Sequence, residues 1–300
     1  MISKEKIDAV IICTPHPEHR NPTLKALEYG AHVLVEKPLA VTLEDCDAMI
    51  AAAEKHKRTL GVVSQRRFFE SAMRMKDAID GGKIGTPALA TVLMLGWRNE
   101  AYYNSDPWRG SWQYEGGGVL VNQAPHQLDL LQWFMNDEVE ELFGISKNIN
   151  HPYIEVEDTA VAIARFKKGG IANILVSNSQ KPGIYARVHV HGSNGASVGV
   201  QTDGGAMFIA GVPSAIEPAK NDIWTIPGEE NLPAQWEAED RAFFKTIDPV
   251  GYYLRLQDRD FILAVAEGRA PLVTGNEGRK TVQLFNAIYT SNATNRPVKL

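Results

Sequence analysis

The chain has 300 residues, of which 44% are hydrophobic, which is enough for one large or two ordinary domains. Its formal net charge of -5 and its scattered lysines and arginines lack the basic stripe of a nucleic-acid-binding protein, so no such partner is expected. The first residues lack the apolar core of a signal peptide, no apolar run approaches the ~18 residues of a membrane span, and only Cys13 and Cys46 are present, so we expect a cytoplasmic protein without a membrane partner.

The first part of the chain alternates apolar runs with amphipathic stretches. In chain order we expect strand 7–13, helix 22–29, strand 32–35, helix 43–57, strand 59–64 and helix 70–80. This order is typical of a parallel sheet with right-handed crossovers. Strand 7–13 contains Cys13 and reads as buried on both faces, so we expect this thiol to be inert.

The pattern changes near Gly85, which we take as a domain boundary. The remaining elements are predicted as strands 88–95, 139–146, 159–166, 171–178, 185–191 and 196–201 and helices 119–134, 234–247, 254–267 and 276–294. Strands that follow one another across turns favour a mostly antiparallel sheet. Overall the sequence predicts an α/β chain, with half of a doubly wound parallel sheet in 1–85 and an α+β domain with a large open sheet in 86–300.

The glycine-rich loop of a dinucleotide-binding domain is missing from the sequence. No glycine starts a G-x-G-x-x-G pattern, and neither 116–118 nor 192–199 follows a parallel strand into a helix. Strand 7–13 would therefore carry an unpaired apolar edge, which aggregates unless it is covered. We expect the sequence to begin downstream of that loop; the alternative is a chain that has lost the loop.

Polar residues follow two of the predicted parallel strands at their carboxyl ends, where open parallel sheets bind ligands. Thr14 and Pro15 follow the first, and Glu36, Lys37 and Pro38 follow the second. A lysine there can hydrogen-bond an oxygen that loses its proton. Taken alone, a Lys-Pro pair after a strand also fits a plain turn.

A second group of polar residues lies on the predicted helix after the triple glycine. Asn122, His126 and Asp129 have the i, i+4, i+7 spacing of one helix face. A histidine can accept a hydroxyl proton near neutral pH, although a buried histidine capped by Asp129 is the alternative. Ahead of the helix, three residues offer polar and aromatic surface for a hydroxylated ring: Trp108, Arg109 and Tyr114.

Three stretches carry a family resemblance that covers essentially the whole chain. They read IDAVIICTPHPEHRNPTLKALEYGAHVLVEKPLA, GGGVLVNQAPHQLDLLQWF and FILAVAEGRAPLVTGNEGRKTVQLFNAIYTSNATNRPVKL. In this order they resemble the glucose–fructose oxidoreductase, inositol dehydrogenase and rhizopine-catabolism oxidoreductases (Gfo/Idh/MocA). The resemblance implies a Rossmann domain followed by an open-faced sheet through which subunits pair, giving a homodimer or homotetramer.

The resemblance also implies NAD or NADP as cofactor and assigns roles to the candidate residues. The residues that would line the cofactor are Thr14, Pro15, His19, Glu36, Lys37 and Arg67. Substrate would be bordered by Trp108, Arg109, Tyr114, Asn122 and Asp129. Lys37, His126 and Asn122 would form the catalytic group, with His126 as acid/base. Many members have aspartate where this chain has Asn122, and an amide positions a ligand but does not relay a proton.

The main hypothesis is hydride transfer from a secondary hydroxyl of a sugar, glycoside or cyclitol. One alternative keeps the cofactor but processes a glycoside through a keto intermediate, with loop 97–114 holding the aglycone. The other is a non-catalytic sugar sensor on the same scaffold. His189 and His191 share a strand face without a third ligand, so no metal site is predicted.

Overall fold

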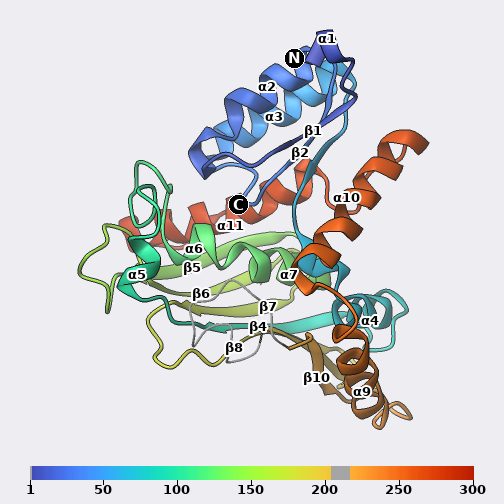
Figure 1. The fold of residues 1–300 in the computed structure, drawn as a ribbon. Coiled ribbons are helices and arrows are strands. Elements are labelled where there is room, and N and C mark those ends of the chain that lie inside the picture. The colour runs from blue at the N-terminus through green and yellow to red at the C-terminus, as the bar shows by residue number, and fades with distance from the viewer. Residues whose placement is uncertain (1, 204–216) are drawn as a thin grey trace.

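The computed structural model describes residues 2–203 and 217–300 and divides them between two sheets that lie one above the other (Figure 1). The first has three strands in the order β1-β2-β3, and the second has eight in the order β10-β9-β8-β4-β7-β6-β5-β11. Strands of the first sheet are parallel, and in the second, over the residues that the structure describes, only β4 and β7 pair in parallel. The predicted fold class is therefore confirmed.

The small sheet follows the predicted alternation of strands and helices. Its elements are α1 (Ile2–Glu5), β1 (Ala9–Ile12), η1 (His16–Glu18), α2 (Arg20–Glu28), β2 (His32–Val35), α3 (Leu43–His56), β3 (Leu60–Val62), η2 (Gln65–Phe68) and α4 (Glu70–Asp80). Thr42 caps α3 by accepting a hydrogen bond from the backbone N–H of Asp45, as its capping-box spacing predicts. Helices α2 and α3 pack together over one side of this sheet (Figure 1).

The large sheet begins after Gly85, where the predicted alternation of strands and helices ends. Its strands are β4 (Pro87–Leu95), β5 (Val139–Lys147), β6 (Thr159–Phe166), β7 (Ile171–Ser177), β8 (Tyr185–Gly192), β9 (Ser197–Asp203), β10 (Lys220–Trp224) and β11 (Val298–Lys299). The two short edge strands β10 and β11 are not evident from the sequence. The helices between and after these strands are α5 (Glu100–Tyr103), α6 (Val119–Asn122), α7 (Pro125–Met135), α9 (Leu232–Phe244), α10 (Pro249–Glu267) and α11 (Gly275–Thr294).

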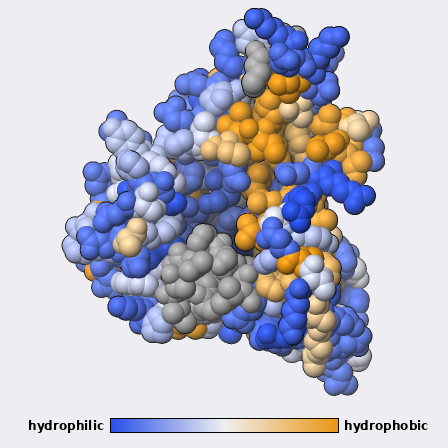
Figure 2. All heavy atoms as spheres, in the orientation of Figure 1, coloured by the Kyte–Doolittle hydropathy of each residue, from blue (hydrophilic) through white to orange (hydrophobic). Residues whose placement is uncertain are grey.

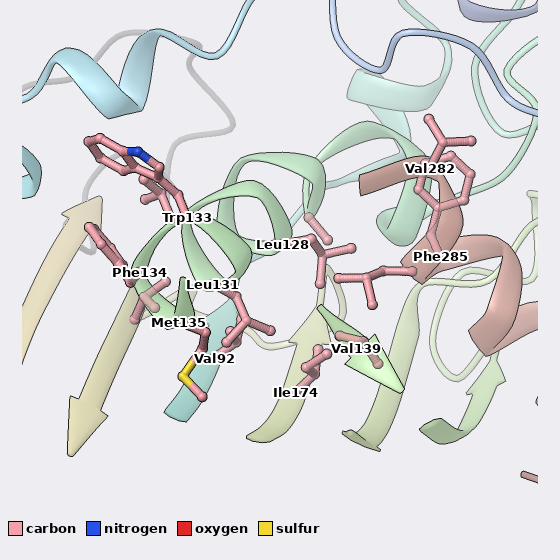
Figure 3. Packing of buried hydrophobic residues seen from close by; sticks show 14 of the residues in the cluster. Val92, Leu128, Leu131, Trp133, Phe134, Met135, Val139, Ile174, Val282 and Phe285 are labelled. Atoms are coloured by element: carbon pink, nitrogen blue, oxygen red, sulfur yellow. The ribbon is translucent and has the colours of Figure 1, made fainter. Parts of the chain in front are cut away.

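The main core lies between the large sheet and the two helices α7 and α11. Figure 3 shows Leu128 and Leu131 of α7 pointing toward Val92 and Ile174 on the sheet, with Phe285 of α11 beside them. These side chains are buried, and at ~25 cal/mol per Å² each contributes about 1.5–3 kcal/mol to folding. This packing fixes α7, and therefore the histidine that α7 carries, over the sheet.

The opposite face of the large sheet bears outward apolar side chains. Strand β6 alternates strictly, with Val161 and Ile163 exposed and Ala160 and Ala162 buried. Ile145 of β5 lies directly opposite Val161 in the antiparallel register. Ile163 is 62% exposed, which is high for a residue of a central strand. This face therefore offers a continuous apolar surface.

The predicted helix over 119–134 is two helices in the structure. α6 ends at Asn122, and α7 begins at Pro125, whose missing N–H suits the first helical position. Asn122 and His126 therefore do not share one continuous helix. The break changes the expected geometry of the candidate site.

A second apolar surface covers β1 and α10, where Figure 2 shows hydrophobic side chains gathered on one side of the molecule. Strand β1 pairs only with β2 among the described residues, and Ile11 is 51% exposed. The expectation of a strand buried on both faces is therefore wrong for β1. Across residues 2–203 and 217–300, no helix combines the length and apolar character needed to cross a membrane.

Candidate active site

The loops after β1 and β2 lie at the same edge of the small sheet because the two strands are parallel. His19 joins the two loops, since its Nε2 lies 2.9 Å from the Thr14 carbonyl oxygen and its Nδ1 lies 2.9 Å from the Pro38 carbonyl oxygen. The ring is fully buried, and this burial lowers the pKa of His19. The buried ring lies between the two carbonyl groups and therefore holds the strand ends in a fixed relation.

Lys37 links the small sheet to the α6 segment. Its Nζ donates to the backbone carbonyl of Asn122 at 2.6 Å and to the Asn122 Oδ1 at 3.2 Å. Burial is the main cause that lowers the pKa of Lys37 to about 8. The lysine therefore titrates close to physiological pH, which suits a group that holds or donates a proton during a reaction.

The triple glycine before α6 allows a close approach of backbone that side chains would prevent. A Cβ on Gly118 would lie 1.8 Å from the Glu157 carbonyl oxygen, and Gly116 has a φ of +88°. The Glu157 carboxylate accepts hydrogen bonds from the N–H groups of Gly118 and Leu120, both at 3.0 Å, and thereby caps the start of α6. Glycines and buried carboxylate together fix where α6 begins.

His126 lies in the first turn of α7 and faces the same cavity as Lys37. Its Nδ1 is buried and has no hydrogen-bond partner among the described residues. Burial, with the charges of Arg66 and Lys37, holds the pKa of His126 well below its usual value. The imidazole is therefore neutral at physiological pH and available as a proton acceptor.

These groups surround a cavity of 490 Å³ between the two sheets. It is lined by nine of the residues singled out in the sequence: Thr14, Pro15, His19, Glu36, Lys37, Trp108, Arg109, Asn122 and His126. Cys13 also lines it, because β1 ends at Ile12 and leaves the thiol exposed rather than inside the strand as expected. The structure thus brings together the strand-end group and the helix group.

Three residues expected at the cavity do not line it, and two of them, Arg67 and Asp129, pair with each other. Arg67, expected beside the cofactor, is 2% exposed, and its Nη2 and Nε donate to Asp129 at 2.7 and 2.8 Å. Asp129, expected to bind substrate or cap His126, also accepts from Ser64 Oγ, and Arg67 makes a further ion pair with Glu277. A buried carboxylate needs a buried cation, and this pairing takes both groups away from the ligand.

The aromatic loop contributes part of the cavity wall. Tyr114 is 55% exposed and does not line the cavity, in contrast to the expected substrate contact. Arg109 lines it and is held in place by Tyr102, whose hydroxyl accepts from Nη1 at 2.6 Å. The Arg109 guanidinium also lies over the ring of Trp108, 4.4 Å from its centroid.

Several lining residues are not singled out by sequence reasoning. They are His16, Gln65, Arg66, Arg98, Tyr102, Gln123 and Asp203. Arg66 stands next to the expected Arg67 in a 3₁₀ turn, where neighbouring side chains point about 120° apart. Arg66 Nη1 forms a 2.6 Å ion pair with Asp203. The pair of arginines is visible in the sequence, but the sequence does not show which of the two faces the cavity.

The paired histidines of β8 lie outside this cavity. His189 Nε2 lies 3.0 Å from an Asp222 carboxylate oxygen, and Arg187 pairs with the same carboxylate. Nowhere in the described ranges do three or more potential metal ligands converge. The candidate site is therefore the cavity between the sheets.

Two family models match the chain in tandem. Residues 1–64 match the oxidoreductase family with an NAD-binding Rossmann fold, and residues 72–198 match the GFO/IDH/MocA C-terminal domain. The chain is 34% identical over 204 residues to the 1,5-anhydro-D-fructose reductase of Ensifer adhaerens, covering 66% of this chain and 59% of that protein. It is 31% identical over 198 residues to the myo-inositol 2-dehydrogenase of Thermotoga maritima, covering 65% and 57%.

Both alignments span less than two thirds of the relative's own length. Among solved structures, the WlbA dehydrogenase of Bordetella pertussis, in complex with NADH and UDP-GlcNAcA, superposes with a TM-score of 0.84. The sequence identity is 26%, and the match covers 100% of this chain and 81% of that one.

Proposed function

The chain belongs to the GFO/IDH/MocA family of oxidoreductases. On that premise we propose that it forms part of an NAD(P)-dependent enzyme that oxidises a secondary hydroxyl of a sugar, glycoside or cyclitol. One observation carries the proposal. Lys37, from the end of a parallel strand, and His126, from a helix on the other sheet, line one cavity.

The residues at the strand ends fit the nicotinamide end of such a cofactor. Open parallel sheets bind dinucleotides beyond the carboxyl ends of their strands, which is where Thr14 and Glu36 lie. The buried, unpartnered Nδ1 of His126 opposite them is suited to a polar ligand. We assign the holding of the cofactor to Thr14, Pro15, His19, Glu36 and Lys37. When bound, the oxidised nicotinamide accepts the hydride that the alcohol carbon gives up.

The proton of the substrate hydroxyl goes to His126. This imidazole is neutral because its pKa is depressed by burial and by neighbouring cations, so it can accept a proton from the hydroxyl as hydride leaves the carbon. Lys37 donates a hydrogen bond to the same oxygen and stabilises its developing negative charge. Asn122 positions Lys37 through the two hydrogen bonds described above. The products are a ketone, a reduced cofactor and one proton.

The chemistry of the cavity supports a hydroxylated ring as substrate. Arg109 and Gln123 offer hydrogen-bond donors, and Trp108 offers an apolar ring face. The names of the relatives, an anhydrofructose reductase and an inositol dehydrogenase, point to substrates of the same kind. The choice among sugar, glycoside and cyclitol is left to the assay.

The test is a Lys37→Met variant of the protein. Reduction of NAD⁺ and NADP⁺ is measured with myo-inositol and UDP-GlcNAcA, and oxidation of NADH and NADPH with 1,5-anhydro-D-fructose. We expect Lys37→Met to lower kcat by about 10²–10³-fold, because the loss of one donor that stabilises an oxyanion costs about that much. Lys25→Met, on the exposed surface of α2, serves as the matched control and should leave turnover unchanged. Turnover near the wild-type rate in Lys37→Met would refute the assignment.

A second candidate function uses the same residues to process a glycoside through a keto intermediate. It is favoured by the aromatic side of the cavity, where Trp108 and Tyr102 could hold an aglycone. Product analysis separates the two functions. Release of an intact sugar without net NADH favours this candidate, whereas a ketone formed with stoichiometric NADH favours the dehydrogenase.

The open face of the large sheet is the proposed contact with a second copy of the chain. It presents Ile145, Val161 and Ile163 side by side, and a monomer would leave these side chains in water. Pairing two such faces gives a closed, isologous dimer, from which a tetramer can form.

A further inference from the structure

Glu115 is a buried carboxylate that the chemistry described so far leaves without a role. It directly precedes the triple glycine and is 1% exposed. Its Oε2 accepts a hydrogen bond from the backbone N–H of Gly110, and its Oε1 accepts one from Asn122 Nδ2, both at 2.5 Å. Burial raises the pKa of this carboxyl group, which these two hydrogen bonds partly oppose because they favour the ionised form.

The Asn122 amide connects this carboxylate to Lys37. Its Nδ2 donates to Glu115, while its Oδ1 accepts from Lys37 Nζ at 3.2 Å. An ammonium can only donate and a carboxylate can only accept, so these two partners fix which way the amide points. One amide group therefore lies between a buried cation and a buried anion, and it hydrogen-bonds both.

Glu115 also has a structural role, which is the simpler explanation for its presence. The carboxylate does tie the loop at Gly110 to α6, because each of its two oxygens accepts one hydrogen bond, and a glutamine would keep only one of these two acceptors. A buried charge costs several kcal/mol unless an opposite charge compensates it. Lys37 and Arg109 are the cations whose charges act on Glu115, and Glu115 in turn favours the charged form of Lys37. A side chain that only joined the loop to α6 would not need this electrostatic coupling between Glu115 and Lys37.

We propose that Glu115 is a positioning residue that acts through the Asn122 amide as a second counter-charge of Lys37, beside the adjacent Glu36 carboxylate, and holds the ammonium group protonated and in place. The inference rests on the proposed function in so far as Lys37 is the group that stabilises the substrate oxygen. Other ionisable groups also surround Lys37, and each must be considered in reading its titration. They are Glu36, Arg66, Arg109, Glu115, His16 and His126.

The decisive experiment follows the titration of Lys37 itself by NMR, in the protein labelled with [ε-¹³C]lysine and assigned with Lys37→Arg. In Glu115→Gln the Lys37 midpoint should fall by about one pH unit, the lower end of what an opposite charge at close range supplies. Asp240→Asn is the matched control, because Asp240 is also a buried carboxylate but pairs with Arg74 rather than with α6. The double variant Glu115→Gln/Asn122→Asp, which moves the charge to the neighbouring side chain, should restore the midpoint.

An unchanged Lys37 midpoint in folded Glu115→Gln would overturn the proposal. If Glu115→Gln does not fold, the wild-type protein labelled with [δ-¹³C]glutamate gives the same answer. The Glu115 carboxyl carbon should be ionised at pH 8 and should show a second inflection at the Lys37 midpoint, which Lys37→Met removes. A Glu115 carboxyl protonated at pH 8, or the lack of that inflection, would equally overturn it.

These titrations need no turnover, so they separate the inference from the proposed function. In active enzyme, the alkaline limit of kcat/KM should move with the Lys37 midpoint, about one pH unit lower in Glu115→Gln. Coupling without turnover of any test compound supports the counter-charge and refutes the dehydrogenase. Turnover without coupling refutes the counter-charge alone.

Discussion

Replacing Asp129 with alanine should destabilise the fold by about 4 kcal/mol. The carboxylate accepts two hydrogen bonds from Arg67, at 2.7 and 2.8 Å, and one from Ser64. Removing one partner of a buried ion pair costs about 3–5 kcal/mol, and the orphaned Ser64 hydroxyl adds about 1 kcal/mol. Glu277 remains 2.9 Å from Arg67 and compensates part of the charge, which keeps the expected loss near the middle of that range.

The assay is urea unfolding followed by tryptophan fluorescence. Trp133 is a suitable reporter because the Arg67 guanidinium lies 5.1 Å from its ring centroid. Glu28→Ala, which removes an exposed ion pair with Lys25, is the control and should leave the unfolding midpoint unchanged. The double variant Arg67→Met/Asp129→Leu should recover at least half of the loss, since an apolar pair removes both of the most buried charges and Glu277 keeps its ion pair with Lys280. A loss below about 1 kcal/mol in Asp129→Ala, or no recovery in the double variant, would refute the reasoning.

Three further outcomes are expected. Burial lowers the pKa of Lys37 to about 8 and only its ammonium form donates to the substrate oxygen, so kcat/KM should fall above pH 8; a continued rise there would contradict this role. Burial raises the pKa of Glu157 to about 7, whereas the unfolded chain releases this proton near pH 4.5. As the pH rises from 4.5 to 7, the wild type should therefore lose up to ~3 kcal/mol of stability relative to Glu157→Gln, and urea unfolding at pH 5 and 8 measures this loss. Ile163→Asp should prevent the proposed dimer from forming, so that light scattering gives the mass of a monomer; a dimer mass in this variant would place the interface elsewhere.

The sequence predicts the strands and helices well where hydrophobic period and caps agree. The small parallel sheet, the capped helix α3 and the alternating strand β6 all follow from local patterns. The predicted helix 119–134 fails at Pro125, where the apolar period continues although the backbone starts a new helix. The edge strands β10 and β11 are short, and their pairing is set by distant partners rather than by their own residues.

The candidate site was predictable only in part, for a similar reason. Lys37 and His126 are suggested by strand-end and helix positions and are singled out by the family resemblance, and the structure brings both to the cavity. The choice of Arg66 over Arg67 depends on how a 3₁₀ turn is oriented, and a sequence pattern does not contain that orientation. The sequence does not single out Glu115, because no cation stands near it in a recognisable spacing. Its link to Lys37 runs through the neutral amide of Asn122 and is visible only in three dimensions.

A buried polar group also limits how far the two sheets can move apart around the cavity. It consists of Ser64, Arg67, Asp129 and Glu277. It joins the end of β3 to α7 and α11, so the two sheets cannot swing apart without breaking buried charge contacts. The end of the small sheet and the two helices beneath it are therefore held together as one unit, which keeps the width of the gap between the sheets nearly constant.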